Sequence, residues 1–131
     1  MNILIVDDDE LSRVMLSEML EELGSCDAAA GGREGLGLFH RAFAAGKPYE
    51  LICLDVIMPD IDGFQLLRQI RSTETENSVA LPDAARIIMI SSMSDLEHIM
   101  ASFDAACEAY MIKPLERQEL FGQLEQWGLT N

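Results

Sequence analysis

Short runs of apolar residues alternate along the chain with longer segments in which apolar positions recur at helical spacing. The runs are continuous rather than alternating, which is typical of strands buried on both faces of a parallel sheet. We therefore predict strands at residues 3–6, 51–54, 87–90 and 110–112, with a weaker strand of small residues at 26–30.

The segments between these runs carry apolar residues three or four positions apart, which predicts amphipathic helices. Gly24 and Gly46 directly follow two of these segments and favour helix ends there. The polar stretch 72–85 is interpreted as a long loop, with a short helical extension at 73–77. The predicted helices cover residues 10–23, 33–45, 64–70, 95–103 and 116–127.

A strand followed by a helix thus occurs five times in succession. This order predicts an α/β fold with a doubly wound parallel sheet and right-handed crossovers. A length of 131 residues fits one domain over residues 1–131, and 49% hydrophobic with 24% charged residues is ordinary for a globular protein.

Acidic residues strongly outnumber basic ones, with 23 Asp and Glu against 9 Lys and Arg and a net charge of −14. Such a surface repels phosphate backbones and anionic lipids, so we expect no direct nucleic-acid partner and no membrane partner. The first apolar run is too short for a signal peptide, and no apolar stretch approaches the ~20 residues of a membrane span. We therefore expect a cytoplasmic protein.

The three cysteines indicate neither a metal site nor a disulfide framework. Cys26, Cys53 and Cys107 are far apart and odd in number, and their spacing matches no zinc motif. Cys53 lies inside an apolar run, where we expect a buried thiol that packs as a small hydrophobe.

Reactive side chains follow four of the predicted strands. In an open parallel sheet the carboxyl ends of the strands share one edge, and ligands bind there. Any one of these residues alone is typical of a turn or a helix cap, whereas their shared edge indicates a site. They are Asp7, Asp8 and Asp9 after the first strand, Asp55 after the third, Ser91 at the fourth and Lys113 after the fifth.

These side chains together suit phosphoryl chemistry. Carboxylates that converge on one site repel one another, and a hard cation such as Mg²⁺ relieves the repulsion. With the hydroxyl of Ser91 and the ammonium of Lys113, such a cation forms a pocket for a phosphoryl group. An aspartate carboxylate can itself accept that group and form an acyl phosphate.

These residues resemble the receiver domain of bacterial two-component response regulators. The likeness covers the whole chain and rests on four ordered segments. The resemblance implies a flavodoxin-like, five-stranded parallel sheet with strand order 2-1-3-4-5, flanked by five helices. The segments are ILIVDDD at 3–9, LDVIMPDIDG at 54–63, IMISS at 88–92 and AYMIKP at 109–114.

The resemblance also implies roles for the residues of the site. Asp55 corresponds to the phosphoacceptor. Asp8 and Asp55 correspond to direct ligands of Mg²⁺ or Mn²⁺, Asp7 to a ligand through water, and the backbone carbonyl of Ile57 to the remaining protein ligand. Lys113 corresponds to the lysine that pairs with the acceptor and then with the phosphoryl group.

A switch is implied by the same comparison. Ser91 corresponds to the hydroxyl that moves to hydrogen-bond the phosphoryl group, and Tyr110 to the aromatic side chain whose rotamer follows it. The Lys113–Pro114 peptide bond is expected to be cis.

The chain departs from the family at Ala106, where glycine is common. A positive φ is disfavoured for alanine, so the local turn could differ.

The implied function is a phosphoacceptor switch. A histidine kinase or a histidine phosphotransfer protein would supply the phosphoryl group. The face formed by the fourth helix, the fifth strand and the fifth helix would signal to a downstream protein target. The domain would promote its own phosphorylation and dephosphorylation, but as a switch rather than an enzyme. We expect a monomer or a weak phosphorylation-dependent dimer, acting alone or as one part of a longer regulator.

Two other classes of function stay open. The first is a protein-interaction adaptor on a receiver fold that works without phosphorylation, which loss of a site residue would indicate; all five expected site residues are present. The second is a phosphohydrolase with an aspartyl nucleophile after its first strand, because Asp7 and Asp9 superficially fit such enzymes. A phosphoryl analogue would then label Asp7 rather than Asp55.

Two further expectations concern docking and signal lifetime. Apolar positions of the first helix span an arc wider than one buried face requires, so Leu11, Met15 or both should be exposed and contact the phosphohistidine-bearing helical bundle. The alternative is that both lie in the core.

By the resemblance, Ile57 and Met93 flank the path of water to the phosphorus. Neither side chain can orient a water molecule, so we expect slow self-dephosphorylation.

Overall fold

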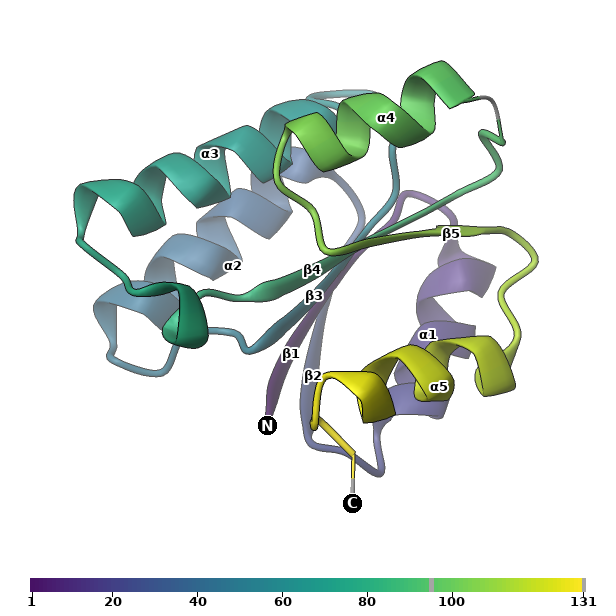
Figure 1. The fold of residues 1–131 in the computed structure, drawn as a ribbon, viewed down its shortest axis with the longest axis horizontal. Helices are drawn as coiled ribbons and strands as arrows, with labels where there is room; N and C mark the ends of the chain where they lie inside the picture. The colour runs from purple at the N-terminus through teal and green to yellow at the C-terminus, as the bar shows by residue number, and fades with distance from the viewer. Residues whose placement is uncertain (95, 131) are drawn as a thin grey trace.

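A parallel five-stranded sheet lies at the centre of the fold (Figure 1). The computed structural model describes residues 1–94 and 96–130. The strand order is β2-β1-β3-β4-β5, so the expected topology is confirmed. All five predicted strands are present as β1 (Asn2–Val6), β2 (Ser25–Ala29), β3 (Leu51–Leu54), β4 (Arg86–Ser91) and β5 (Ala109–Ile112).

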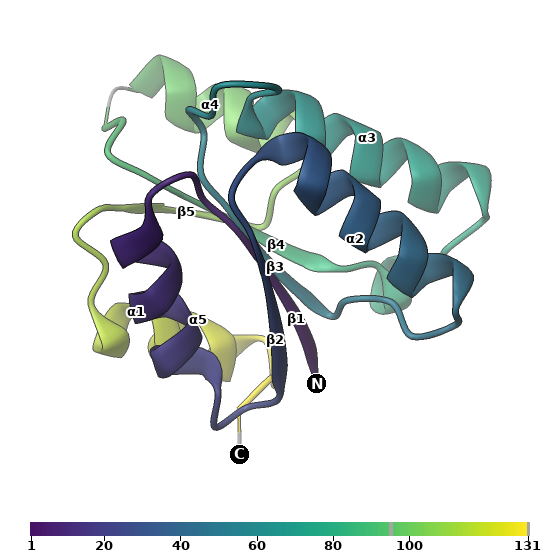
Figure 2. The same ribbon diagram turned by 180° about the vertical axis from the view of Figure 1, so that it is seen from behind.

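The α-helices cover both faces of this sheet and give the molecule three layers (Figures 1 and 2). On one face lie α1 (Glu10–Leu20) and α5 (Arg117–Gln126). The opposite face is covered by α2 (Gly32–Ala44), α3 (Gly63–Glu76) and α4 (Leu96–Asp104).

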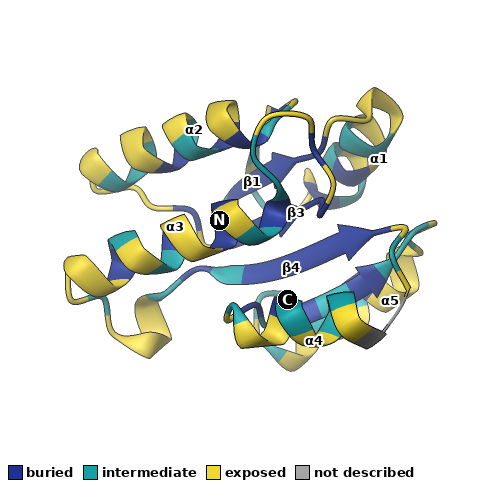
Figure 3. Ribbon diagram, turned by 90° about the horizontal axis from the view of Figure 1, so that it is seen from above, coloured by how far each residue is buried: buried dark blue, intermediate teal, exposed yellow. Residues whose placement is uncertain are grey.

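Successive side chains of the inner strands point to opposite faces of the sheet and fill two separate apolar cores. In β3, Ile52 and Leu54 pack toward α2 and α3, whereas Leu51 and Cys53 pack toward α1 and α5. Burial on both sides explains why these strands read as continuous apolar runs (Figure 3). The edge strand β2 is mostly exposed, which explains its weak apolar signal.

The predicted long loop at 72–85 is wrong for its first part, because α3 continues to Glu76. Polar residues hold these last turns in place. The guanidinium of Arg71 lies 2.6 Å from a carboxylate oxygen of both Glu74 and Glu108, and buried Glu74 accepts a hydrogen bond from Ala85 N–H at 2.8 Å. The predicted extension at 73–77 is therefore the end of α3, and a short 3₁₀ helix (Leu81–Asp83) follows.

The turn after α4 shows a second difference. Ala106 adopts a φ of +74°, so the turn keeps a left-handed residue although alanine occupies it. Hydrogen bonds from Ala106 N–H to Phe103 O and from Cys107 N–H to Ser102 O form the Schellman pattern that requires this conformation. Smaller differences concern the ends of helices: α1 ends at Leu20 rather than at 23, and the predicted start of α4 at 95 lies outside the described residues.

Candidate functional site

Three carboxylates meet at the carboxyl edge of the sheet. Asp7 follows β1 and Asp55 follows β3, which are neighbouring strands, and Asp55 N–H donates to Val6 O at 2.9 Å across them. One carboxylate oxygen from each of Asp7, Asp8 and Asp55 lies within 4.8 Å of the others. Asp7 and Asp55 are buried, whereas Asp8 is exposed. This all-oxygen set fits a hard divalent cation, as the sequence predicted.

Lys113 joins two of these carboxylates. Its Nζ lies 2.8 Å from Asp7 Oδ2 and 3.5 Å from Asp55 Oδ2. Burial alone would lower the pKa of Lys113, but the hydrogen bond to Asp7 and the charges of Asp55 and Asp7 outweigh it, and the pKa is raised. Lys113 is therefore a fixed positive charge beside Asp55. The Lys113–Pro114 bond is cis, as expected.

The carboxyl group of Asp55 is held in an unfavourable environment for its charge. Burial and then the charge of Asp7 raise its pKa to about 6, although Lys113 acts in the opposite direction. A bound cation would favour the ionised, nucleophilic form. The start of α3 lies close to the backbone of this residue, because a Cβ at Gly63 would lie only 2.2 Å from the Asp55 carbonyl oxygen.

Ser91 and Tyr110 are linked through the β4–α4 loop. Ser91 is buried at the end of β4, and its Oγ accepts a hydrogen bond from Met93 N–H at 3.2 Å. The half-buried Tyr110 donates its hydroxyl proton to Met93 O at 2.5 Å. Both expected switch residues therefore contact the same loop residue, next to the carboxylate edge.

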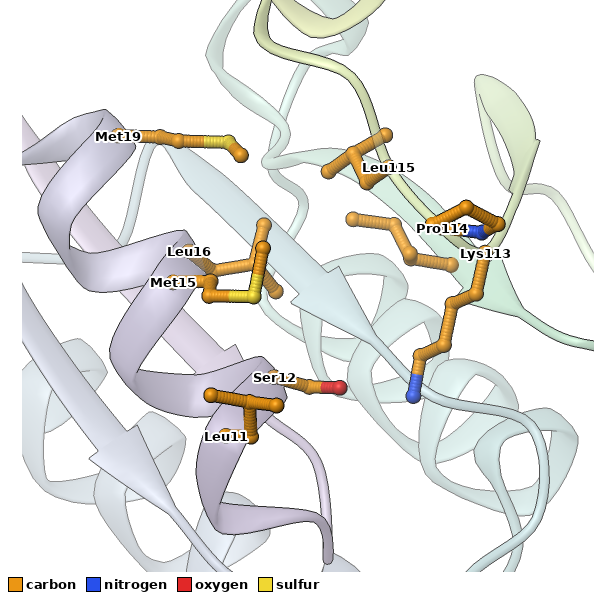
Figure 4. A pocket seen from close by; sticks show the side chains of 9 residues that line it. Leu11, Ser12, Met15, Leu16, Met19, Lys113, Pro114 and Leu115 are labelled. Atoms are coloured by element: carbon orange, nitrogen blue, oxygen red, sulfur yellow. The ribbon is translucent and has the colours of Figure 1, made fainter.

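An apolar groove runs from the carboxylate edge along α1 (Figure 4). Leu11 and Met15 are 65% and 42% exposed, so the expected exposure of both is confirmed and the core alternative is wrong. The groove has a volume of about 360 Å³, and Lys113 lies at the end of it that faces the site. Its walls come from α1, β4 and the segment after β5: Leu11, Ser12, Met15, Leu16, Met19, Ile90, Lys113, Pro114 and Leu115.

Two contacts of the loops around the carboxylates were not predicted from the sequence. The Arg13 guanidinium donates to Asp7 O at 2.8 Å, and the Asp60 carboxylate accepts hydrogen bonds from the first turn of α2. Residues from distant parts of the chain make the second contact, so local patterns do not reveal it. The one signal in the sequence for the contact of Asp60 with α2 is the pair of glycines at 31–32, which no local motif explains.

Comparison with known proteins agrees with this architecture. The family model of the response regulator receiver domain matches residues 3–125. The response regulator MprA of Mycolicibacterium vanbaalenii is 34% identical over 93% of the chain, and ArlR of Staphylococcus epidermidis is 32% identical over 94%. The chain spans about half the length of these regulators, 48% and 50%.

Solved structures show the same fold. A putative response regulator from Chloroflexus aurantiacus superimposes with a TM-score of 0.79 at 28% identity, covering 95% of this chain and 94% of that one. A Borrelia burgdorferi CheY, solved as a CheX–CheY–BeF3–Mg²⁺ complex, gives 0.82 at 24% identity, covering 98% and 90%. The chain belongs to the receiver-domain family of two-component response regulators. Among the described residues, no helix is long and apolar enough to cross a membrane.

Proposed function

We propose that this receiver is a phosphoacceptor switch in which Asp55 accepts a phosphoryl group from phosphohistidine. The observation that carries the proposal is that carboxylate oxygens of Asp7, Asp8 and Asp55 lie within 4.8 Å of one another. Lys113 forms ion pairs with Asp7 and Asp55. A purely structural turn has no need of three carboxylates in one place, since their mutual repulsion is destabilising.

Asp8 and Asp55, the Ile57 carbonyl and, through water, Asp7 would hold Mg²⁺ or Mn²⁺. When bound, the cation neutralises charge on the phosphoryl oxygens. The all-oxygen donor set supports this assignment, and a receiver of the same fold was solved with Mg²⁺. Because carboxylate oxygens of Asp7, Asp8 and Asp55 already lie within 4.8 Å of one another, these side chains need little rearrangement to receive a cation.

In the transfer, one carboxylate oxygen of Asp55 attacks phosphorus while the phosphorus–nitrogen bond to the donor histidine breaks. The electron pair of that bond stays on the imidazole, which leaves as the neutral base once it takes up a proton. The ammonium of Lys113, already 3.5 Å from Asp55, pairs with an oxygen of the arriving group.

The acyl phosphate then provides a hydrogen-bond acceptor beside Ser91. Turning Ser91 Oγ toward it would end the bond from Met93 N–H and release the loop that Tyr110 also holds. The population of loop and Tyr110 conformations would shift, and with it the face made by α4, β5 and α5. That face carries Glu97, Glu116 and Glu119, so its target is expected to be a protein with basic residues.

The phosphoryl donor is expected to be a histidine kinase or a histidine phosphotransfer protein, docked through Leu11 and Met15. Both side chains are exposed and line the groove that leads to Lys113. An apolar groove beside the acceptor suits a helix that presents a phosphohistidine at its surface.

The chemical test uses a small phosphodonor, which needs no docking partner. The intact mass of the protein should increase by one phosphoryl group in the presence of Mg²⁺ and stay unchanged after chelation. Asp55→Asn should abolish the increase while the fold is retained, and Asp62→Asn, a change of the same size in the same loop, should not. An Asp55→Asn variant that is still labelled at the wild-type rate contradicts the assignment, and a wild type that is never labelled favours the adaptor hypothesis.

A further inference from the structure

The first turn of α2 has no cap of its own. Gly31 occupies the N-cap position and offers no side chain, so the first N–H groups of the helix need acceptors from elsewhere. Asp60 supplies acceptors for the first two of these groups. Its Oδ1 accepts from Gly32 N–H at 3.0 Å, and its Oδ2 accepts from Arg33 N–H at 2.9 Å. The cap of α2 therefore comes from the loop between β3 and α3.

The two partners also fit closely in shape. A Cβ at Gly32 would lie 2.2 Å from Ile61 Cγ1 and 2.7 Å from Ile61 O, and a Cβ at Gly31 would lie 3.2 Å from both carboxylate oxygens of Asp60. Only glycine at position 32 lets the loop approach the helix this closely, because a side chain there would meet the backbone of Ile61, whereas at position 31 the Asp60 carboxylate would have to shift slightly. We call the contact between Gly31–Gly32 and Asp60–Ile61 the α2 clamp.

The clamped loop is the one that carries the acceptor and a backbone ligand. It begins at Asp55, and its inner side is fixed by buried Met58 and by the hydrogen bond from Gly63 N–H to Val56 O at 2.8 Å. Ile57, whose carbonyl is assigned to the cation, is 58% exposed and has no such packing of its side chain. The α2 clamp fixes the outer side of the same loop.

Hydrogen bonds from the backbone, that of Arg33 first, lower the pKa of Asp60 to about 2. Its carboxylate therefore stays ionised, with both oxygens available as acceptors, at any pH near neutral.

We propose that Asp60 is a positioning residue of the divalent-cation site: by clamping the loop to α2, it fixes the Ile57 carbonyl where the cation needs a ligand. The inference rests on the proposed function, since it presumes that the cation binds at Asp8 and Asp55. Coupling between two sites is reciprocal, so cation binding should in turn stabilise the first turn of α2.

The test measures Mg²⁺ affinity by calorimetry, without any phosphoryl donor. Asp60→Ala should weaken Mg²⁺ binding about tenfold, the lower end of what loss of an outer-shell partner costs. The Mg²⁺ affinity of Asp60→Asn should lie between those of the wild type and Asp60→Ala, because the asparagine amide has one acceptor oxygen where the carboxylate has two. Ala42→Gly is the matched control: it weakens the same helix at its other end and should leave the affinity unchanged.

Gly32→Ala tests the clamp from the other side, because it leaves Asp60 intact and pushes the loop away through Ile61. It should weaken Mg²⁺ binding as well. In the wild type, Mg²⁺ should slow amide hydrogen exchange at Gly32 and Arg33, and Asp60→Ala should remove that protection. A destabilised helix alone does not produce this cation-dependent protection.

Equal Mg²⁺ affinities in the wild type, Asp60→Ala and Gly32→Ala would overturn the inference, and so would a loss of affinity that Ala42→Gly reproduces. These results differ from failure of the proposed function itself, in which the wild type binds no Mg²⁺ and Asp8→Ala changes nothing.

Discussion

The raised pKa of the Asp55 carboxyl has a measurable consequence for stability. Its pKa lies at about 6 in the folded protein, against an ordinary value of 3.8. Between these two pH values the folded state holds a proton that the unfolded state has released. Without a bound cation, this group's contribution therefore makes the free energy of unfolding fall as the pH rises through that window, and level off above it.

Asp55→Asn removes that titration. We expect the variant to exceed the wild type in stability by on the order of 1 to 3 kcal/mol at pH 7, with the difference shrinking toward zero near pH 4. Urea unfolding of both proteins across this range, with chelator present, measures the difference. A gap that is constant with pH, or largest at the acidic end, contradicts the assigned environment of Asp55.

A second prediction for a single residue concerns Ala106 and its φ of +74°. Alanine is strained in this conformation and glycine is not, whereas glycine gains entropy in the unfolded chain. Ala106→Gly should therefore stabilise the protein by about 0.5 to 1 kcal/mol, observed as a higher melting temperature. Ala105→Gly, one residue earlier, should destabilise it. If both changes destabilise equally, the left-handed turn is absent in solution.

At the scale of elements, the groove beside α1 allows docking to be separated from chemistry. Leu11→Ala and Met15→Ala should slow phosphotransfer from a phosphohistidine-bearing partner by about tenfold, a loss of ~1.4 kcal/mol of docking energy. The rate with a small phosphodonor should not change. Val14 is the control, since it is also exposed on α1 but does not line the groove. If Val14→Ala slows transfer as much, the groove is not the docking site.

The loops that follow β3 and β4 are predicted to set the lifetime of the acyl phosphate. Ile57 is exposed and Met93 half-buried, and neither side chain can hold a water molecule for attack on phosphorus. Wild-type dephosphorylation should be slow, and Ile57→Asn with Met93→Glu should accelerate it by about tenfold or more, because positioning dominates phosphoryl-transfer catalysis. Loss of phosphate from purified protein measures both rates. A double variant no faster than the wild type shows that these side chains do not set the lifetime.

The elements also show what the sequence could and could not predict. Strands buried on both faces read as continuous apolar runs, so the number of strands followed from the sequence pattern, and their order in the sheet followed from the resemblance. The end of α3 did not, because Glu74 is polar and yet buried, bonded to Arg71 and to the Ala85 amide. The α2 clamp was missed for a different reason, since Asp60 bonds to residues far away in sequence.

The candidate site could be predicted from the sequence, because the topology places the carboxyl ends of parallel strands at one edge of the sheet independently of side-chain conformation. The positions of Asp7, Asp55 and Lys113 needed no further knowledge. The contact of Tyr110 with Met93 O did require the structure, since it depends on side-chain rotamers and on the course of a loop.

At the scale of the whole molecule, the net charge of −14 destabilises the folded state through repulsion, so a bound cation should stabilise it. A ligand that binds only the folded state raises its stability by mass action, so millimolar Mg²⁺ should raise the melting temperature by a few degrees, about 1 to 2 kcal/mol. Asp8→Ala should remove most of this increase, and Asp104→Ala, a loss of the same charge away from the cluster, should not. An equal response in all three proteins would indicate general screening of charge rather than a site.

The most direct test of the central claim is to locate the phosphoryl group. The protein is phosphorylated with a small donor and Mg²⁺, reduced with borohydride, which converts an aspartyl phosphate to homoserine, and digested for peptide mass spectrometry. We predict homoserine at position 55 alone. Homoserine at position 7, or at no aspartate while phosphate is retained elsewhere, would contradict the assignment of Asp55 as the acceptor.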